Sequence, residues 1–570
     1  MGDLRKKATF LAEAERHFYY QKAKIHFLKQ GDRNTKFFHD MVKWNAARNS
    51  ILAITKADGS IITSVLDIAQ EFVDFYTSLL GTEDQTRPVD DGVFHWGLSL
   101  TLELASNLCR AVTPAEVKTA VFQISDNKAP GPDGYTSCFL RKTWNIVGDR
   151  VCRAVMDFFR SGRMLRQLNH TIIALVPKSE HSPSVADYLP ISCGNVIYKV
   201  ITKIIADRLS PALEQFIDRS QAAFIGGRNI TDNIFLAQEM VLQYSRKRIS
   251  PRCTINVDLR KAFDLVSWTF LSRVLHGYGF PPLFISWIME CVSTTSFSVA
   301  LNDSLHGLFP GQKGLRQGDP MSPALFLLCM EYFSRLIKRN TSNSDSNFHL
   351  KCEKLKITHL LFADDLTLFS RGDLPSIHIL MECLQEFRDV SGLAVNTTKS
   401  NIFTAGIQDD ILDGILAMTE FARVFPLPMA VIEKIHRLCR VFLWNSKRAP
   451  VAWEEICHPK EEGGLGIRHI KSWNVALLAG VLWNIYREAD TFWAKWVNEV
   501  YLRGALPWDW QPKKGDSPLL RRLAEIQDRI IIDFGSTEAA IQHIAEWTDS
   551  KGLVTSKAYD YFKPKLPRQP

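Results

Sequence analysis

Two adjacent aspartates, Asp364 and Asp365, are well suited by type and spacing to bind a metal ion. They lie between apolar runs in ITHLLFADDLTLFS (357–370), a pattern typical of a β-hairpin with both acids at its tip. An ordinary hairpin is the alternative, because aspartate is common in turns. Two carboxylates at one tight tip repel each other, however, so a divalent cation that neutralises them would make the arrangement more favourable.

A third aspartate, Asp258, stands in the segment TINVDLRKAFD (254–264). Apolar side chains at positions 255, 257 and 259 alternate with polar ones at 254, 256 and 258, which predicts a strand with one buried face and Asp258 on the other. A turn or cap role is the alternative for a lone aspartate at a strand end. Together with the hairpin, Asp258 could hold two Mg²⁺ ions about 3.5–4 Å apart, which activate an attacking 3′-hydroxyl and stabilise a leaving pyrophosphate.

Helices are predicted on either side of Asp258. Residues 196–209 carry apolar side chains at helical spacing, with Lys199, Lys203 and Arg208 expected on the opposite face as a basic back. Ser322 and Pro323 predict the start of a second helix, which ends in basic residues. These elements predict a mixed α+β protein.

The composition indicates a multidomain globular protein. The chain has 570 residues, 46% of them hydrophobic, and a net charge of +8, which suits a polyanionic partner without identifying one. The eleven cysteines form no Cys-x-x-Cys pair, so neither a disulfide framework nor a zinc site is predicted. The start lacks a signal peptide and the longest apolar runs are too short to cross a bilayer, so we expect a soluble, intracellular protein without a membrane partner.

Three regions are predicted along the chain. Residues 1–100 form a mostly helical segment that is basic over 8–45 and ends beyond an acidic linker at 82–91. The basic helix is more simply a solvated face over a core stripe than a nucleic-acid contact. Residues 101–403 carry the strands and carboxylates, with the motif core at 170–403, and residues 404–570 are helical and rich in tryptophan.

Eight blocks in a fixed order resemble the reverse transcriptase of plant non-LTR, LINE-type retrotransposons. They are KAPGPDG (128–134), ALVPKSE (174–180), DYLPIS (187–192), QAAFIGGRNITDNI (221–234), VDLRKAFD (257–264), GLRQGDPMSP (314–323), FADD (362–365) and SGLAVNTTKS (391–400). The resemblance covers roughly residues 20–500 and implies a right-hand polymerase with fingers, a palm built on an antiparallel sheet, and a thumb. By this resemblance Asp258, Asp364 and Asp365 are the catalytic, metal-binding residues.

The resemblance also implies a nucleotide-binding set. Leu259 offers a backbone carbonyl, and Phe263 matches the bulky residue that excludes a 2′-hydroxyl. Gln317 matches a residue of the nucleotide and template pocket, with Gly314 and Gly318 allowing close backbone approach. Two lysines complete the set: Lys178 as the fingers lysine that meets the triphosphate, and Lys399 as a lysine able to protonate pyrophosphate.

The chain departs from the family pattern in two places. Leu189 stands in DYLPIS where the family usually has an arginine that pairs with phosphate oxygens. After GILAMTEFARV (414–424), the chain continues directly with FPLPMAVIEKIHRLCRVFLWN (425–445), where relatives carry a long thumb segment, so a truncated thumb is expected. The endonuclease and the Cys/His-rich module of relatives are not visible in the sequence either.

The resemblance implies an RNA-directed DNA polymerase that uses two Mg²⁺ ions, with Mn²⁺ as a substitute. Its expected partners are an RNA template, a DNA primer, the RNA–DNA hybrid and dNTPs, with no obligate protein partner evident, and its expected locations are nucleus and cytoplasm. A decayed element fragment with residual nucleic-acid binding is the main alternative, favoured by Leu189 and the shortened thumb. An intron-maturase-like splicing partner is a more distant one.

Overall fold

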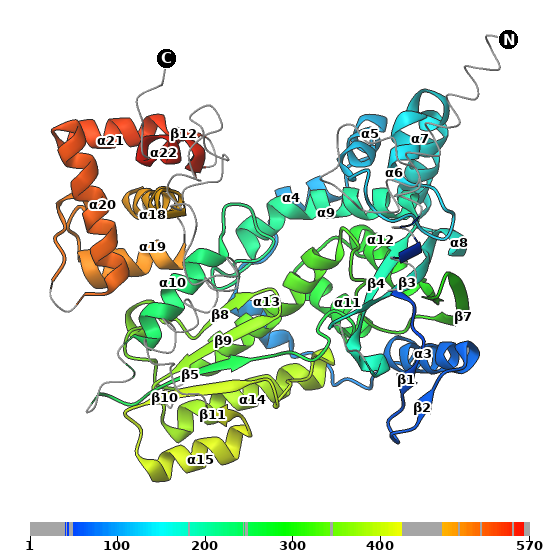
Figure 1. The fold of residues 1–570 in the computed structure, drawn as a ribbon, viewed down its shortest axis with the longest axis horizontal. Coiled ribbons are helices and arrows are strands. Elements are labelled where there is room, and N and C mark those ends of the chain that lie inside the picture. The colour runs from blue at the N-terminus through cyan, green and yellow to red at the C-terminus, as the bar shows by residue number, and fades with distance from the viewer. Residues whose placement is uncertain are drawn as a thin grey trace. The chain divides into compact units, whose positions relative to one another are not determined.

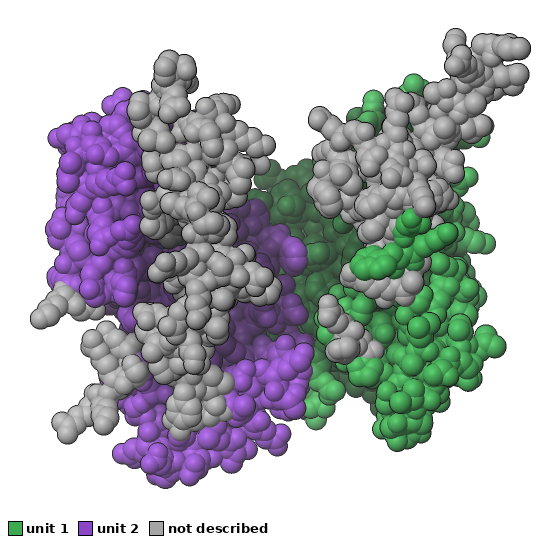
Figure 2. Space-filling view, in the orientation of Figure 1, with its two compact units in different colours: residues 1–216, 260–333, 386–394 green, residues 217–259, 334–385, 395–570 purple. Residues whose placement is uncertain are grey.

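The structure is a computed structural model that describes residues 40, 43–44, 49–179, 183–242, 244, 249–342, 346–423, 470–487, 491–513, 516–549 and 552–563. The chain divides into two compact units, coloured separately in Figure 2. Unit 1 comprises residues 1–216, 260–333 and 386–394, and unit 2 comprises residues 217–259, 334–385 and 395–570. The expected basic helix over 8–45 and the region around the shortened thumb at 425–445 lie almost entirely outside the described residues.

A four-stranded sheet with the order β4-β3-β6-β7 forms one core of unit 1. Its strands are β3 (His170–Pro177), β4 (Tyr188–Gly194), β6 (Ser296–Leu301) and β7 (Ser304–Pro310). The β3 strand is antiparallel to β4 and parallel to β6. Helix α3 (Val65–Leu80) packs on this sheet through Phe72 and Tyr76, and it begins at Ser64, whose hydroxyl accepts the Asp67 N–H.

The remaining elements of unit 1 are short strands and helices joined by loops. They are β1 (Ile54–Thr55), β2 (Ile61–Ile62), η1 (Asp91–Trp96), α4 (Leu102–Leu108), α5 (Pro114–Gln123), α6 (Ser137–Lys142), α7 (Trp144–Ser161), α8 (Arg166–Asn169), η2 (Val185–Asp187), α9 (Val196–Phe216), α11 (Trp268–Gly277) and α12 (Pro282–Ser293). Residues 82–90 form a loop, as the sequence predicts. Helix α13 (Ser322–Thr341) begins at the predicted Ser322 and continues into unit 2.

Helix α9 lies where the sequence predicts a helix, but its basic back is only partly solvent-facing. Lys199 and Arg208 are buried, at 8% and 7% exposure, whereas Lys203 is partly exposed. The Lys199 Nζ donates to the Ala129 carbonyl at 2.9 Å, and the Arg208 guanidinium makes two bonds to the Glu116 carboxylate. Two of the three residues of the predicted basic back are therefore buried against polar partners, which helical periodicity alone does not show.

A five-stranded sheet with the order β11-β10-β5-β9-β8 forms the centre of unit 2 (Figure 1). Its strands are β5 (Arg252–Val257), β8 (His359–Phe362), β9 (Asp365–Ser370), β10 (Asn401–Ala405) and β11 (Ala422–Arg423). The central strand β5 pairs antiparallel with both β9 and β10. Its predicted alternation holds only in part, since Asn256 is exposed while Thr254 is buried and bonded to the Tyr244 hydroxyl.

A second part of unit 2 is a group of helices around a tryptophan-rich core, drawn in orange and red in Figure 1. Fully buried Trp493 and Trp496 stack with ring centroids 5.8 Å apart, and Leu236 and Met240 of α10 belong to the same core. Further elements with residues in or against this core are α10 (Ile230–Val241), η3 (Glu353–Leu355), α18 (Ile470–Tyr486), α19 (Phe492–Val497), η5 (Asn498–Leu502), η6 (Pro507–Asp509), α20 (Pro518–Phe534), α21 (Thr537–Glu546), β13 (Gly552–Leu553) and α22 (Thr555–Phe562). Unit 2 also contains β12 (Thr548–Asp549), α15 (Asp409–Thr419) and most of α14 (Leu374–Ser391), which crosses into unit 1.

The chain thus has the expected mixture of helices and sheets, and within the described ranges none of its helices is both long enough and apolar enough to span a bilayer. The region boundaries at residues 100 and 403 stay predictions.

Candidate active site

The pairing of β5 with β9 brings the predicted carboxylates to the same end of these two neighbouring strands in the unit 2 sheet. In the antiparallel register Val257 faces Leu366, so continuing by one residue sets Asp258 opposite Asp365. Asp258 is half-buried and follows directly after the last β5 residue, rather than lying within the strand. The strand register, which burial of one sheet face fixes, therefore places Asp258 next to Asp365.

The two adjacent acids stand at the tip of the β8–β9 hairpin, as the sequence predicts. Phe362 pairs with Asp365, which leaves Ala363 and Asp364 as the turn. Ala363 adopts a left-handed φ of 56°, a conformation that costs free energy for a residue with a Cβ. Asp365 is exposed and Asp364 half-buried, so both carboxylates are accessible.

The electrostatics of Asp365 reflect both neighbouring acids. Partial burial raises the pKa of Asp365 above its ordinary value, and the negative charges of Asp364 and Asp258 raise it further. A carboxylate whose pKa is raised by like charges gains most from a cation that neutralises the group. The three carboxylates are therefore close enough to interact.

Asp258 is held in place by the turn before β10. The Asn396 side-chain amide donates to Asp258 Oδ2 at 3.0 Å, and the Asn396 N–H donates to the Asp258 carbonyl at 2.7 Å. The Asp258 N–H donates to the Ser400 hydroxyl at 3.1 Å, and that hydroxyl donates to the Asn396 carbonyl. Asp258 thus has its main chain and one carboxylate oxygen fixed, while Oδ1 accepts no hydrogen bond from the part of the chain that the structure describes.

The donor chemistry of the three aspartates fits a magnesium ion. Mg²⁺ prefers oxygen ligands and is typically bound by one or two protein carboxylates together with substrate phosphates. Among the residues that the structure describes, no three His, Cys, Asp or Glu side chains are grouped closely enough to enclose a metal by themselves. A magnesium site here would accordingly be completed by substrate and water, as an open catalytic site requires.

Unit 1 contains three of the five predicted nucleotide-binding residues, Lys178, Phe263 and Gln317. The Gln317 amide donates to the Asp264 carboxylate at 3.2 Å, and the positive charge of Lys178 acts on the same carboxylate. Burial raises the pKa of Asp264 to about 6, although Lys261, the Gln317 hydrogen bond and Lys178 oppose the rise. Lys178 is exposed just beyond β3, with its Nζ donating to the Ala186 carbonyl at 2.8 Å.

Phe263 and Leu189 also lie in unit 1. The Phe263 ring is half-buried and stacks on the fully buried Phe326 ring, with centroids 4.6 Å apart. This packing restricts the rotation of Phe263, as a side chain that excludes part of a ligand requires. Leu189 lies in β4 opposite Val176 and is 38% exposed, so an arginine at this position would reach solvent.

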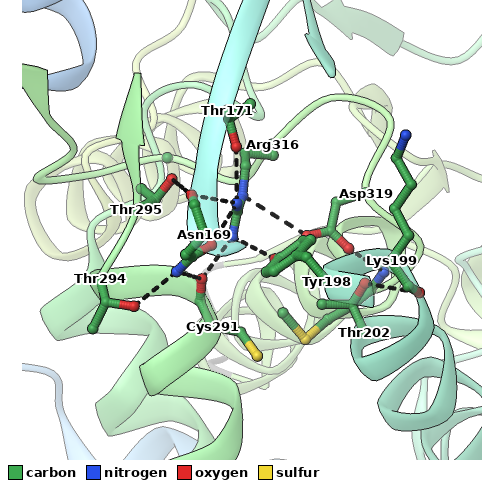
Figure 3. Close-up of polar contacts among 12 residues, drawn as sticks. Asn169, Thr171, Tyr198, Lys199, Thr202, Cys291, Thr294, Thr295, Arg316 and Asp319 are labelled. Carbon is green, nitrogen blue, oxygen red and sulfur yellow. Dashed lines mark hydrogen bonds and ion pairs between the residues drawn. The ribbon is translucent and has the colours of Figure 1, made fainter. Parts of the chain in front are cut away.

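A buried polar network anchors the loop that carries Gln317 (Figure 3). The Arg316 guanidinium donates to Asn169 Oδ1 at 2.7 Å, to Thr171 Oγ1 at 3.1 Å and to the Tyr198 hydroxyl, and it lies 4.0 Å from the Tyr198 ring centroid. The Tyr198 hydroxyl in turn donates to Asp319. All of these side chains are at least nine-tenths buried, so Gln317 projects from a rigid support.

Gly314, in the same loop, has a φ of 87°, and a Cβ there would lie 2.6 Å from the Asp264 carbonyl oxygen. The close approach that Gly314 permits is thus to the backbone of Asp264. This contact explains a glycine that the sequence assigned to approach of a base pair.

The last two predicted residues, Leu259 and Lys399, belong to unit 2. Leu259 is buried and forms an isolated antiparallel bridge with Val395. Lys399 is exposed in the turn before β10, and its N–H bonds to the Asn396 carbonyl. Unit 2 therefore brings Asp258, Asp364 and Asp365 together, while Lys178, Phe263 and Gln317 belong to unit 1, and the roles of all eight residues stay predictions.

Three residues that contact the predicted ones or their neighbours were not singled out from the sequence, namely Gln221 and Asn396 in unit 2 and Asp264 in unit 1. Gln221 and Asn396 stand in recognisable blocks, but nothing in an isolated glutamine or asparagine indicates which backbone it will contact across more than a hundred residues of chain. Asp264 carried a signal, since a second acid six residues after Asp258 follows the same strand.

Comparison with known proteins supplies an independent line of evidence. Residues 176–445 match a family model described as reverse transcriptase (RNA-dependent DNA polymerase). The chain is 26% identical over 383 residues to the Transposon TX1 uncharacterized 149 kDa protein of Xenopus laevis, covering 67% of this chain and 29% of that protein. It is 26% identical over 298 residues to the Retrovirus-related Pol polyprotein from type-2 retrotransposable element R2DM of Drosophila melanogaster, covering 52% of this chain and 26% of that protein.

A shorter relative is similar over most of its own length. An uncharacterized mitochondrial protein of Arabidopsis thaliana is 36% identical over 107 residues, which is 19% of this chain and 87% of that protein. By contrast, the chain spans less than a third of the two transposon proteins.

Proposed function

We propose that this chain, which carries a reverse transcriptase domain of the kind found in non-LTR, LINE-type retrotransposons, acts as an RNA-directed DNA polymerase. The reaction is transfer of a nucleotide from a dNTP to the 3′-hydroxyl of a primer paired with an RNA template. The observation that carries the proposal is the register of β5 and β9, in which Asp258 lies opposite Asp365 beside the Asp364 turn. A right-hand arrangement of fingers, palm and shortened thumb, of the plant type, belongs to the same proposal.

In this mechanism Asp258, Asp364 and Asp365 would hold two Mg²⁺ ions, with the backbone carbonyl of Leu259 as a further oxygen ligand. Such ions, when bound, would lower the pKa of the primer hydroxyl and neutralise charge on the triphosphate. Asn396 keeps one Asp258 oxygen occupied, which directs the other oxygen toward a ligand. Lys399 is exposed and can deliver a proton to the departing pyrophosphate.

The unit 1 residues would select and orient the nucleotide. Lys178 supplies a mobile positive charge for the triphosphate. Phe263, held by its stack on Phe326, restricts space at the sugar 2′ position. Gln317 donates to the Asp264 carboxylate at 3.2 Å and directly follows Arg316, whose guanidinium is held by the buried network, so the Gln317 amide would be presented to the nucleotide from a fixed position.

Template choice tests this proposal. The purified chain is given one DNA primer annealed to an RNA template, the same primer on a DNA template, or the primer alone, with Mg²⁺ and dNTPs. We expect the primer to be extended on the RNA template and not to be extended when no template is present. Salt-sensitive binding of the primed template without extension would instead support the alternative, a fragment that retains nucleic-acid binding only.

A further inference from the structure

The turn that carries the catalytic acids has a strained residue next to Asp364. Ala363 has a φ of 56° and is 8% exposed, so its left-handed conformation is set inside the protein rather than by contact with water. Such a conformation persists when surrounding contacts determine it.

Gln221 supplies contacts to both polar backbone groups of Ala363. Its Oε1 accepts the Ala363 N–H at 3.0 Å, and its Nε2 donates to the Ala363 carbonyl at 3.4 Å. The same Oε1 accepts the Ala223 N–H at 2.9 Å. With 1% of its surface exposed, Gln221 thus uses its amide to hold a main-chain turn from inside unit 2.

The segment around Gln221 is itself held firmly. Its backbone runs beside β8, since the Leu361 N–H donates to the Ser220 carbonyl at 2.8 Å and the Ala222 N–H donates to the Leu361 carbonyl at 3.1 Å. The Arg228 guanidinium also donates to the Gln221 carbonyl at 2.8 Å and to the Ile217 carbonyl at 2.9 Å. A side chain on so rigid a support can fix the group it binds.

We infer that Gln221 is a positioning residue, whose bidentate contact with Ala363 sets the direction of the Asp364 and Asp365 carboxylates toward the metal site. This inference rests on the proposed function for the identity of the site. Gln221 is not itself a metal ligand, and its role would be to raise the affinity of the three aspartates for the metal ion. Loss of the contact would leave Ala363 free to relax out of its left-handed conformation and turn the acids away.

Two substitutions separate positioning from plain structural support. Gln221→Met keeps the length of the side chain and removes both hydrogen-bonding groups. The matched control is Asn233→Ala, because the Asn233 amide donates to the Leu361 carbonyl at 2.9 Å and so supports the same hairpin without touching its tip. Gln221→Asn is a second variant, which keeps a buried amide but is one methylene too short to reach Ala363.

The readout is the affinity for Mn²⁺ alone, measured by electron paramagnetic resonance of the free ion, with Asp364→Asn defining the site-specific part. Loss of a residue that orients a metal ligand typically lowers metal affinity 10- to 100-fold. We expect about a tenfold loss in Gln221→Met and Gln221→Asn and no comparable loss in Asn233→Ala. Wild-type affinity in the folded Gln221 variants, an equal loss in Asn233→Ala, or no Asp364-dependent binding in the wild type would overturn the inference.

Primer extension by the same preparations distinguishes this inference from the proposed function. If the chain binds Mn²⁺ in a Gln221-dependent way but extends no primer, the positioning role of Gln221 stands and the polymerase function is wrong. If the chain extends primers while Gln221→Met binds Mn²⁺ like the wild type, the polymerase function stands and the positioning role is wrong.

Discussion

The side-chain amide of Asn396 donates to Oδ2 of Asp258 at 3.0 Å, while the Asn396 N–H donates to the Asp258 carbonyl at 2.7 Å. The two residues are 138 positions apart in the chain. One asparagine therefore orients both the main chain and the carboxylate of the first predicted metal ligand. This relationship links the turn before β10 to the end of β5.

Asn396→Ala should lower primer-extension turnover by about 10- to 100-fold, the usual effect of removing a group that orients a metal ligand. The Mg²⁺ concentration for half-maximal rate should rise in parallel. Asn401→Ala is the control, because its amide donates to the Lys399 carbonyl in the same turn without touching Asp258. Equal losses in the two variants would mean that the turn matters and the Asp258 contact does not.

Phe263→Val should relax the discrimination against ribonucleotides. A smaller side chain on the Phe326 support opens space at the sugar 2′ position, so the ratio of kcat/KM for dNTP to that for the matching rNTP should fall by at least about tenfold, or about 1.4 kcal/mol. Phe284→Leu, a truncation at a fully buried position of α12, controls for general loss of packing. An unchanged ratio in Phe263→Val would remove Phe263 from nucleotide selection.

Leu189→Arg should improve the use of nucleotides. Leu189 is partly exposed in β4, opposite Val176 near the end of β3, and Lys178 directly follows β3. An arginine at position 189 would therefore keep its charged group in water and would not have to be desolvated. A charge-assisted bond to phosphate contributes about 1.5–3 kcal/mol, so KM for dNTP should fall by about 10- to 100-fold. Leu189→Met is the neutral control. If steady-state kinetics give both variants the same KM, the missing arginine does not limit affinity.

Asp264→Asn should stabilise the protein at neutral pH. Burial raises the pKa of Asp264 to about 6, against an ordinary value of 3.8. Between these values the folded state binds more protons than the unfolded state, so stability falls as pH rises from about 4 to 6 and stays low above it. Replacing the charge by an amide should recover about 1–3 kcal/mol at pH 8 and little at pH 4.

Urea unfolding of Asp264→Asn at pH 4, 6 and 8 checks this expectation, with Asp303→Asn in an exposed loop as the control. Equal stability of Asp264→Asn and the wild type at pH 8 would mean that the carboxylate is well compensated by Lys178, Lys261 and Gln317.

The sequence predicted the parts of this site that depend on local patterns. The hairpin at 357–370 and the strand before Asp258 follow from alternation and turn chemistry, both of which act between near neighbours. The helices at 196–216 and 322–341 follow from apolar periodicity and, for the second, a proline and a serine at its start.

Contacts between distant segments could not be predicted in the same way. The burial of Lys199 and Arg208 depends on the carbonyl of Ala129 and the carboxylate of Glu116, which come from other elements. The same holds for Gln221 with Ala363 and for Asn396 with Asp258, since each pair depends on tertiary packing that brings more than a hundred residues of chain together. The positions of the acids were therefore predictable, and the groups that hold them were not.

In the proposed function, Asp258, Asp364 and Asp365 at the end of the β5–β9 pair are the groups on which nucleotidyl transfer depends. Single-turnover primer extension on an RNA template with Mg²⁺ compares the wild type, Asp364→Asn and Asp373→Asn, a matched carboxylate-to-amide change in unit 2. The Asp373 carboxylate accepts the Ser376 N–H at 3.0 Å and the Asn347 amide at 3.3 Å. We expect extension by the wild type and by Asp373→Asn, and a rate at least about a thousandfold lower in Asp364→Asn. A wild-type chain that adds no more nucleotides than Asp364→Asn would contradict the proposed function.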